Sequence, residues 1–391
     1  MKKMILSAAG ILLAFAPAFG RDMGDVLKEI EKGNLELQAK KLANSATVYD
    51  LAAENMPDAP SVEYSPFFHK GVSGVSSSEL VVSQEFDFPT LYSARSKAGK
   101  LQGEALSEQY LTKRRDLLLQ AKEKCLSIVM LDRQIALAKE RLEVSEQLLL
   151  LVEKRMKAGD ATALEENRVK IEHMDLQTEL AGYETERGIL ADDLSTLAGN
   201  AAIDTQGMDY PLETVPANAE QLQTLLFSGD TGMKAAEATV EAMRQEVEVA
   251  RQGWIPKLSL GYRRNTDGSE ASNGFLVGVA FPIYSTGKRV KAATARRAAA
   301  ELEMENTRAR LQGEVKALYN ELRQLQKTLS IYDGTLLDES LRLLRKSVDS
   351  GIMTMTDYYT EADKINQKKL SYIETENRYH QVLSRINRNS L

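Results

Sequence analysis

LVVSQEFDFP at residues 80–89 returns later in the chain as FLVGVAFP at residues 275–282. A glycine turn follows each copy after a similar interval, KAGD at residues 157–160 and DSGI at residues 349–352. The prolines that end the two apolar stretches are 193 residues apart, and the two glycines are 192 residues apart. This agreement indicates a tandem duplication, and an internal repeat decides the architecture of a chain before any single residue does.

The duplication predicts the domain organisation. Each repeat should contain one β-hairpin, and a polar, proline-containing linker should join the repeats. The expected segments are a signal peptide at 1–20, a first repeat at 21–198 with its hairpin at about 59–88, a linker at 199–218, and a second repeat at 219–391 with its hairpin at about 256–282.

Residues 1–20 have the pattern of a secretory signal peptide. Two lysines precede an apolar run, and small residues mark a cleavage site at Ala18-Phe19-Gly20. A membrane anchor is the alternative, but the apolar run is shorter than the roughly 20 residues that a helical span needs. We therefore expect an exported protein.

Helices of unusual length dominate the rest of the sequence. Two long helices are expected at about 90–158 and 283–350, each roughly 100 Å long at 1.5 Å per residue. Their apolar residues recur at alternating intervals of three and four, which is a coiled-coil seam, and the seam shifts by one residue after Leu337. Shorter helices, at about 22–55, 160–198, 219–253 and 353–388, would pair end to end into rods that match the long helices.

The two hairpins supply four strands. Phe275, Val277, Val279 and Phe281 alternate with smaller side chains, as in the wall of a membrane barrel. We expect strands at about 60–65, 79–88, 256–264 and 274–281, with a loop at 265–273. Because four strands cannot close a barrel, their outer edges require other chains.

Composition excludes several classes of function. The formal net charge of −6 gives no support for nucleic-acid binding. The lone cysteine, Cys125, is expected to be a small buried residue of a helix. The three histidines, His69, His173 and His380, have no spacing typical of a metal site. No nucleophile and base occur together, so we expect no catalysis, no cofactor and no metal.

Three short sequence motifs give further evidence on the fold. NLEL at 34–37, WIPKLSL at 254–260 and FPIYSTGKR at 281–289 are similar to motifs of the outer membrane efflux protein family, whose type member is TolC. The resemblance covers essentially the whole chain beyond residue 20. It implies a mainly α fold with a small membrane barrel: a homotrimer with a twelve-stranded β-barrel in the outer membrane and a helical tunnel extending into the periplasm. The implied partners are outer-membrane lipid, a periplasmic adaptor protein and an inner-membrane pump.

Four residues are candidates for the functional site. Gly159 and Gly351 should form the periplasmic turns, where a helix that stops needs positive φ, and the resemblance implies that these turns contact the adaptor. Asp357 and its counterpart Glu165 are candidates for a pore constriction, where symmetric carboxylates favour cations. The alternative is that each carboxylate only interacts favourably with the positive end of a helix dipole.

The sequence also departs from the family at the turn. Val348 and Met353 stand where TolC carries a tyrosine and an arginine, so the hydrogen-bonded closure of the type member is not carried over. Met353 and Met355 could suggest a Cu(I) site, although packing is the commoner role of methionine at a turn.

The sequence thus predicts an outer-membrane exit duct for a tripartite efflux pump, or for type I secretion. Two other functions stay open at this point: a periplasmic coiled-coil scaffold or chaperone without a pore, and an adhesin with a helical stalk. A scaffold would not need two strand hairpins at equivalent positions of two repeats, and an adhesin stalk would not need helical rods that turn back. The sequence does not identify the transported substrate.

Overall fold

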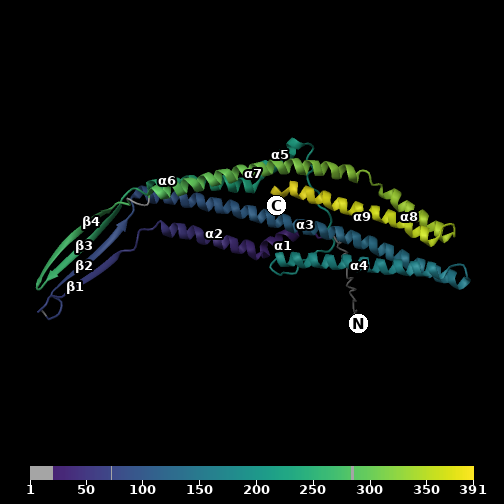
Figure 1. Cartoon of the computed structure of the whole chain (residues 1–391), viewed down its shortest axis with the longest axis horizontal. Coiled ribbons are helices and arrows are strands. Elements are labelled where there is room, and N and C mark those ends of the chain that lie inside the picture. Colours follow the sequence, from purple (N-terminus) through teal and green to yellow (C-terminus); the bar gives the residue numbers. More distant parts are fainter. Residues whose placement is uncertain (1–20, 72, 283–285) are drawn as a thin grey trace, which may run out of the picture. The chain divides into compact units, whose positions relative to one another are not determined.

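The computed structural model describes residues 21–71, 73–282 and 286–391, so the predicted signal peptide lies outside the described residues. Helices and four strands follow one another in the order shown in Figure 1. The elements are α1 (Met23–Gly33), α2 (Leu35–Glu54), β1 (Ser61–Phe67), β2 (Ser77–Phe86), α3 (Pro89–Ala158), α4 (Ala163–Leu197), α5 (Ala219–Gly229), α6 (Thr231–Gln252), β3 (Lys257–Asp267), β4 (Glu270–Ala280), α7 (Thr286–Leu329), α8 (Gly334–Asp349), α9 (Met355–Ile386) and the 3₁₀ helix η1 (Arg388–Ser390).

These elements form two compact units, and each unit takes segments from both repeats. Unit 1 comprises the described residues up to 33, together with 121–212 and 333–380. Unit 2 comprises 34–120, 213–332 and 381–391. The predicted repeats, 21–198 and 219–391, therefore describe the duplication of the sequence and do not coincide with the compact units. The boundaries of the repeats stay a prediction.

The first long helix is confirmed, and the second is not one helix. α3 runs for 70 residues without interruption. The helix expected at 283–350 is instead divided into α7 and α8, and its first three residues lie outside the described part of the chain. α7 ends at Leu329, and a new helix begins after Asp333, which caps α8 by accepting a hydrogen bond from the Leu336 amide at 3.0 Å. The shift in the seam after Leu337 marks this break in the sequence.

Two of the shorter helices are also divided, at equivalent positions in the two repeats. Asn34 separates α1 from α2, and Asp230 separates α5 from α6. The two residues have nearly identical backbone angles, with φ −68° and ψ 115° at Asn34 and φ −66° and ψ 114° at Asp230. Each side-chain oxygen accepts a hydrogen bond at 2.8 Å from the amide three residues later. The duplication therefore preserved an N-cap inside each expected helix.

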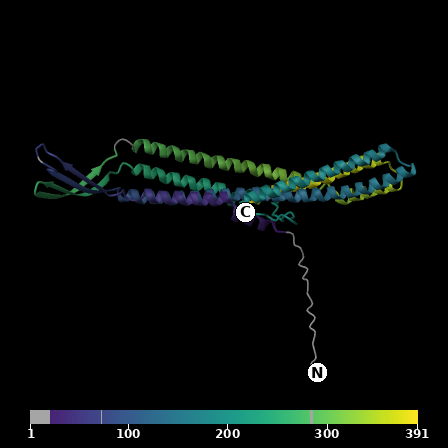
Figure 2. The same cartoon turned by 90° about the horizontal axis from the view of Figure 1, so that it is seen from below.

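The four strands form one antiparallel sheet in the order β1-β2-β3-β4, and they lie side by side in both Figure 1 and Figure 2. The hairpins of the two repeats meet through β2 and β3, where Val82 is opposite Tyr262. The loop expected at 265–273 is wrong, because β3 and β4 continue to a turn of only two residues. Gly268, with φ 58°, supplies the backbone conformation that such a turn needs.

The helical core follows the seam predicted for α3. Leu126, Ile128 and Leu131 are fully or almost fully buried on this helix, and so is Cys125. Burial raises the pKa of the Cys125 thiol to about 12, which makes it a packing residue. The expectation of a small buried cysteine is confirmed.

Among the described residues, no helix combines the length and the apolar composition that crossing a membrane requires.

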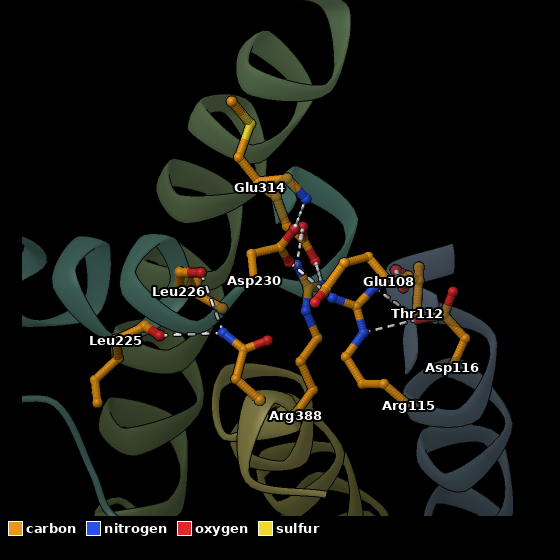
Figure 3. Close-up of polar contacts among 11 residues, drawn as sticks. Glu108, Thr112, Arg115, Asp116, Leu225, Leu226, Asp230, Glu314 and Arg388 are labelled. Atoms are coloured by element: carbon orange, nitrogen blue, oxygen red, sulfur yellow. Dashed lines mark hydrogen bonds and ion pairs between the residues drawn. The ribbon is translucent and has the colours of Figure 1, made fainter. Parts of the chain in front are cut away.

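A buried cluster of charges stabilises unit 2 at the break between α5 and α6 (Figure 3). Asp230 accepts hydrogen bonds from Arg115 at 2.8 Å and from Arg388 at 3.3 Å, while its other oxygen caps α6. Arg388 also pairs with Glu314 on α7, with one contact at 2.9 Å. Asp230, Arg115 and Arg388 are all at least nine-tenths buried. The Asp230 carboxylate therefore joins α3, α6 and η1, and the Glu314 carboxylate adds α7 through Arg388.

Substitution of Asp230 tests this arrangement. We expect Asp230→Ala to lower the free energy of unfolding by about 3–5 kcal/mol, because it leaves two buried guanidinium groups without this partner. Asp333→Ala is the matched control: it removes an exposed N-cap with no buried ion pair and should cost about 1 kcal/mol. The midpoint of chemical unfolding, measured for both variants, checks the difference. Equal losses would show that the ion pairs contribute nothing beyond the cap.

Candidate functional site

Both predicted glycine turns have the same geometry, and both lie in unit 1. Gly159 connects α3 to α4 with φ 79°, and Gly351 connects α8 to α9 with φ 72°. The residue after each glycine donates its amide to a carbonyl five residues earlier, from Asp160 to Arg155 at 2.8 Å and from Ile352 to Ser347 at 3.0 Å. This is a Schellman ending, in which the left-handed residue is normally glycine. The prediction of positive φ at both glycines is confirmed.

The helix after each turn begins with a matching cap. Thr162 accepts a hydrogen bond from the Glu165 amide at 3.3 Å, and the Glu165 carboxylate accepts one from the Thr162 amide at 3.0 Å. In the second repeat, Thr354 accepts a hydrogen bond from the Asp357 amide at 3.2 Å and donates its hydroxyl proton to the Asp357 carboxylate at 2.7 Å. Glycine, threonine and acid are thus spaced by three residues in both repeats. The threonine caps were missed, although this repeated spacing could have revealed them.

The two candidate constriction acids are consequently the third residues of capped helices. Their negative charge complements the positive end of the helix dipole, which is the alternative to a pore constriction that the sequence left open. The Asp357 side chain remains exposed to solvent, whereas Glu165 is half-buried. Capping uses one carboxylate oxygen in each contact, so it leaves the charge of Asp357 accessible from outside the helix.

An apolar cluster lies under the turns. Leu148, Val152, Val169 and Val348 are buried there with Met355, which is completely inaccessible to solvent. Met353 packs against this cluster. The two methionines therefore serve as packing residues. Residues 21–71, 73–282 and 286–391 contain no group of three histidine, cysteine, aspartate or glutamate side chains placed to hold a metal. Val348 places an apolar side chain in the core at the position where TolC has a tyrosine.

Two large apolar side chains at the turns remain outside this core. Ile352 follows Gly351 and is 83% exposed, and Leu164, in the first turn of α4, is 79% exposed. The sequence does not distinguish these two residues, because an exposed and a buried aliphatic residue look alike in a heptad pattern. Each turn therefore exposes one large apolar side chain, although the two stand at different distances from the turn glycine, one residue after Gly351 and five residues after Gly159.

The sheet in unit 2 provides a second functional surface, because its two faces differ in chemistry. Strand register places Val62, Val82, Tyr262 and Phe275 in one row across the sheet. Two further rows on this face are apolar at β3 and β4, where Leu260 is opposite Val277 and Leu258 is opposite Val279. The other face carries mainly polar and small residues, with Phe67, Val81 and Leu276 as apolar exceptions: Ser61, Glu63, Ser83, Glu85, Ser259, Gly261, Arg263 and Gly278.

Substitution of the tip glycine tests the geometry of the turn. Gly351→Ala should destabilise the turn by about 1–2 kcal/mol, because an L-residue resists positive φ. Hydrogen exchange of the amides at 347–353 should accelerate by roughly 5- to 30-fold.

Gly188→Ala is the control, since Gly188 lies within α4 and, like Gly351, has open space around its Cα. It should leave exchange at the turn unchanged and stabilise α4 by up to about 1 kcal/mol. Faster exchange at 347–353 in both variants would contradict a cost that arises from φ.

Comparison with known proteins agrees with this geometry. The pyoverdine export outer membrane protein OpmQ of Pseudomonas aeruginosa is 26% identical over 232 residues, which make up 57% of this chain and 47% of OpmQ. The chain therefore spans about half the length of that curated relative. Among solved structures, the outer membrane protein VceC of Vibrio cholerae has a TM-score of 0.75 at 15% identity, covering 93% of this chain and 95% of VceC. The outer-membrane channel OprN has a TM-score of 0.77 at 16% identity, covering 94% of this chain and 89% of OprN.

The structural similarities show that the chain has the fold of these outer-membrane channels, mainly helical with a four-stranded sheet. The family described as outer membrane efflux protein matches residues 26–200 and 226–388, which is most of the sequence and both repeats. The chain therefore belongs to the outer membrane efflux protein family, an outer-membrane family of channels and not of enzymes.

Proposed function

We propose that the protein is the exit duct of a tripartite efflux pump. In this proposal three copies supply twelve strands to a barrel in the outer membrane, and their helices extend into the periplasm as a tunnel. The observation that carries the proposal is the two-faced sheet. One face suits lipid and the other suits a polar lumen, and within the described residues neither β1 nor β4 has a partner on its outer edge.

Trimer formation supplies what the single sheet lacks. β1 of one copy would pair with β4 of the next, so that every edge strand gains hydrogen bonds and the barrel closes. Tyr262, Phe275 and Val277 would then contact hydrocarbon instead of water. The name of OpmQ refers to export, which supports transport out of the cell as the direction.

The turns at Gly159 and Gly351 would meet the periplasmic adaptor. The exposed side chains of Leu164 and Ile352 provide apolar contacts at both turns. An inner-membrane pump would deliver the cargo through this adaptor, and type I secretion would use the same arrangement with a different pump.

Single-channel recording tests the proposal. The purified full-length protein should have three times the mass of one chain, which is 43.4 kDa before any signal peptide is removed. In a planar bilayer it should conduct and prefer cations. A monomeric, water-soluble protein without conductance would contradict the duct and favour a periplasmic scaffold.

We also propose that Asp357 contributes to a constriction of the duct, and that Glu165 plays a lesser part. Three symmetric copies of the exposed Asp357 carboxylate would concentrate negative potential across a narrow pore. Its hydrogen bond with Thr354 fixes the carboxylate at the start of α9, so the three charges would be held at one level.

Two substitutions separate the charge of Asp357 from its role in the cap. Asp357→Asn removes the charge while its amide oxygen can still accept the hydrogen bond from Thr354. Thr354→Ala removes the cap, at about 1 kcal/mol of stability, and keeps the charge. We expect cation selectivity, measured as the reversal potential in a salt gradient, to fall in Asp357→Asn and to persist in Thr354→Ala. The opposite pattern would assign Asp357 to helix capping alone.

A further inference from the structure

A cavity of about 430 Å³ lies within unit 1, between segments of α3, α4, α8 and α9. Its volume is in the range of pockets that hold small organic molecules. Apolar and aromatic side chains form much of its lining: Leu137, Val144, Leu176, Leu341, Tyr358 and Tyr359. Neither the pore nor the contact surfaces proposed above depend on this cavity.

Three buried polar groups in the lining lack hydrogen-bond partners. They are the hydroxyl of Ser145, the hydroxyl of Tyr359 and the amide oxygen of Asn366. These residues are 1%, 7% and 8% exposed, so their polar atoms have lost most of their access to bulk water. The Ser145 and Tyr359 hydroxyls influence each other, but neither oxygen completes a hydrogen bond of good geometry. Polar groups left in this state are costly unless a ligand or a water satisfies them.

The charges around the cavity are balanced except for two carboxylates. Each of the four basic residues in the lining has an acidic partner: Arg141 with Glu179 at 2.9 Å, Arg342 with Glu339 at 3.2 Å, Arg345 with Asp349 at 3.3 Å, and Lys369 with Asp338 at 2.6 Å. Glu140 and Glu172 have no ion pair or hydrogen bond within the part of the chain that the structure describes. The uncompensated charge of the lining is therefore negative.

Glu172 is the more enclosed of the two carboxylates. It is half-buried on α4, whereas Glu140 is exposed on α3. Burial raises the pKa of Glu172 above its ordinary value, and the attraction of Arg141 and Arg168 opposes this rise without cancelling it. A cation placed in the cavity would supply the missing interaction.

We propose that this cavity binds a small organic cation with an apolar or aromatic body. The Glu172 carboxylate pairs with the cationic group, and the rings of Tyr358 and Tyr359 contact the body of the ligand. Asn366, Ser145 and Tyr359 provide hydrogen bonds to its polar substituents. A small anion would instead meet arginines that are already paired with carboxylates.

The site is formed by residues of one chain and does not require the trimer or the pore. Its failure would leave the proposed duct intact, and failure of the duct would leave the cavity intact.

Ethidium, an aromatic cation whose fluorescence increases when it leaves water, is a suitable probe. It would be titrated into the purified full-length protein in a non-ionic detergent, with protein-free micelles as the blank. We expect saturable binding of one ethidium per chain. Glu172→Gln should weaken this binding at least tenfold, because the variant removes the charge and keeps the shape of the side chain.

Glu186→Gln is the matched control. Glu186 is an exposed residue of α4 that does not line the cavity, and it lies 14 residues further along the same helix. This variant should bind ethidium as the unsubstituted protein does. Asn366→Leu provides a second variant that alters the lining without changing its charge, and it should weaken binding less than Glu172→Gln does.

Three results would overturn the proposal. They are the absence of saturable ethidium binding, equal binding by the Glu172→Gln variant and the unsubstituted protein, and stronger saturable binding of an anionic aromatic dye than of ethidium at the same site. Circular dichroism of each variant shows whether the helices remain folded, so that a loss of binding is assigned to the site.

Discussion

The structure depends on where its helices end, and most of these ends match between the two repeats. Coiled-coil seams bury their apolar residues only where helices run alongside each other. The break between α7 and α8 has no counterpart in the uninterrupted α3, and it leaves Ile331 and Leu336 exposed. Local hydrogen bonds set these ends. Asn34 and Asp230 cap corresponding helices with almost the same backbone angles, and Gly159 and Gly351 end corresponding helices with similar positive φ. Each break satisfies amide or carbonyl groups that would otherwise lack partners.

The sequence was sufficient for features with a strong local cause. The duplication, the uninterrupted α3 and the positive φ of both turn glycines follow from periodicity, from the absence of proline and from the steric freedom of glycine. The breaks at Asp230 and Asp333 were missed, because an aspartate within a heptad pattern also fits a solvated helix face. What distinguishes Asp230 is its contact with Arg115 and Arg388, which are 115 and 158 residues away in the chain. No local pattern can indicate such a partner.

The residues on each face of the sheet were likewise predictable from the sequence only in part. Alternation along β4 predicted one apolar face, and the register confirms that Phe275 and Val277 lie in apolar rows. The sequence could not show that Val62 and Val82 extend one of these rows, because β2 and β3 come from different repeats and their register depends on the fold. The predicted loop at 265–273 is too long for a related reason. Asn265 and Thr266 belong to a strand, but polar residues of this kind are also typical of loops.

Two sites, the charge cluster of unit 2 and the cavity of unit 1, differ in how their buried polar groups are satisfied. In unit 2, separating α3 from α6 would break the hydrogen bonds of Asp230. The buried guanidinium groups would then lack this carboxylate partner, which costs free energy. In unit 1, the cavity contains Ser145, Tyr359 and Asn366 atoms that have no hydrogen bonds to lose and that would gain partners on exposure to water. Rearrangement therefore meets less electrostatic resistance near the turns than it does at the charge cluster. In the proposed duct, this difference would allow unit 1 to rearrange around the cavity while the charge cluster of unit 2 stays intact.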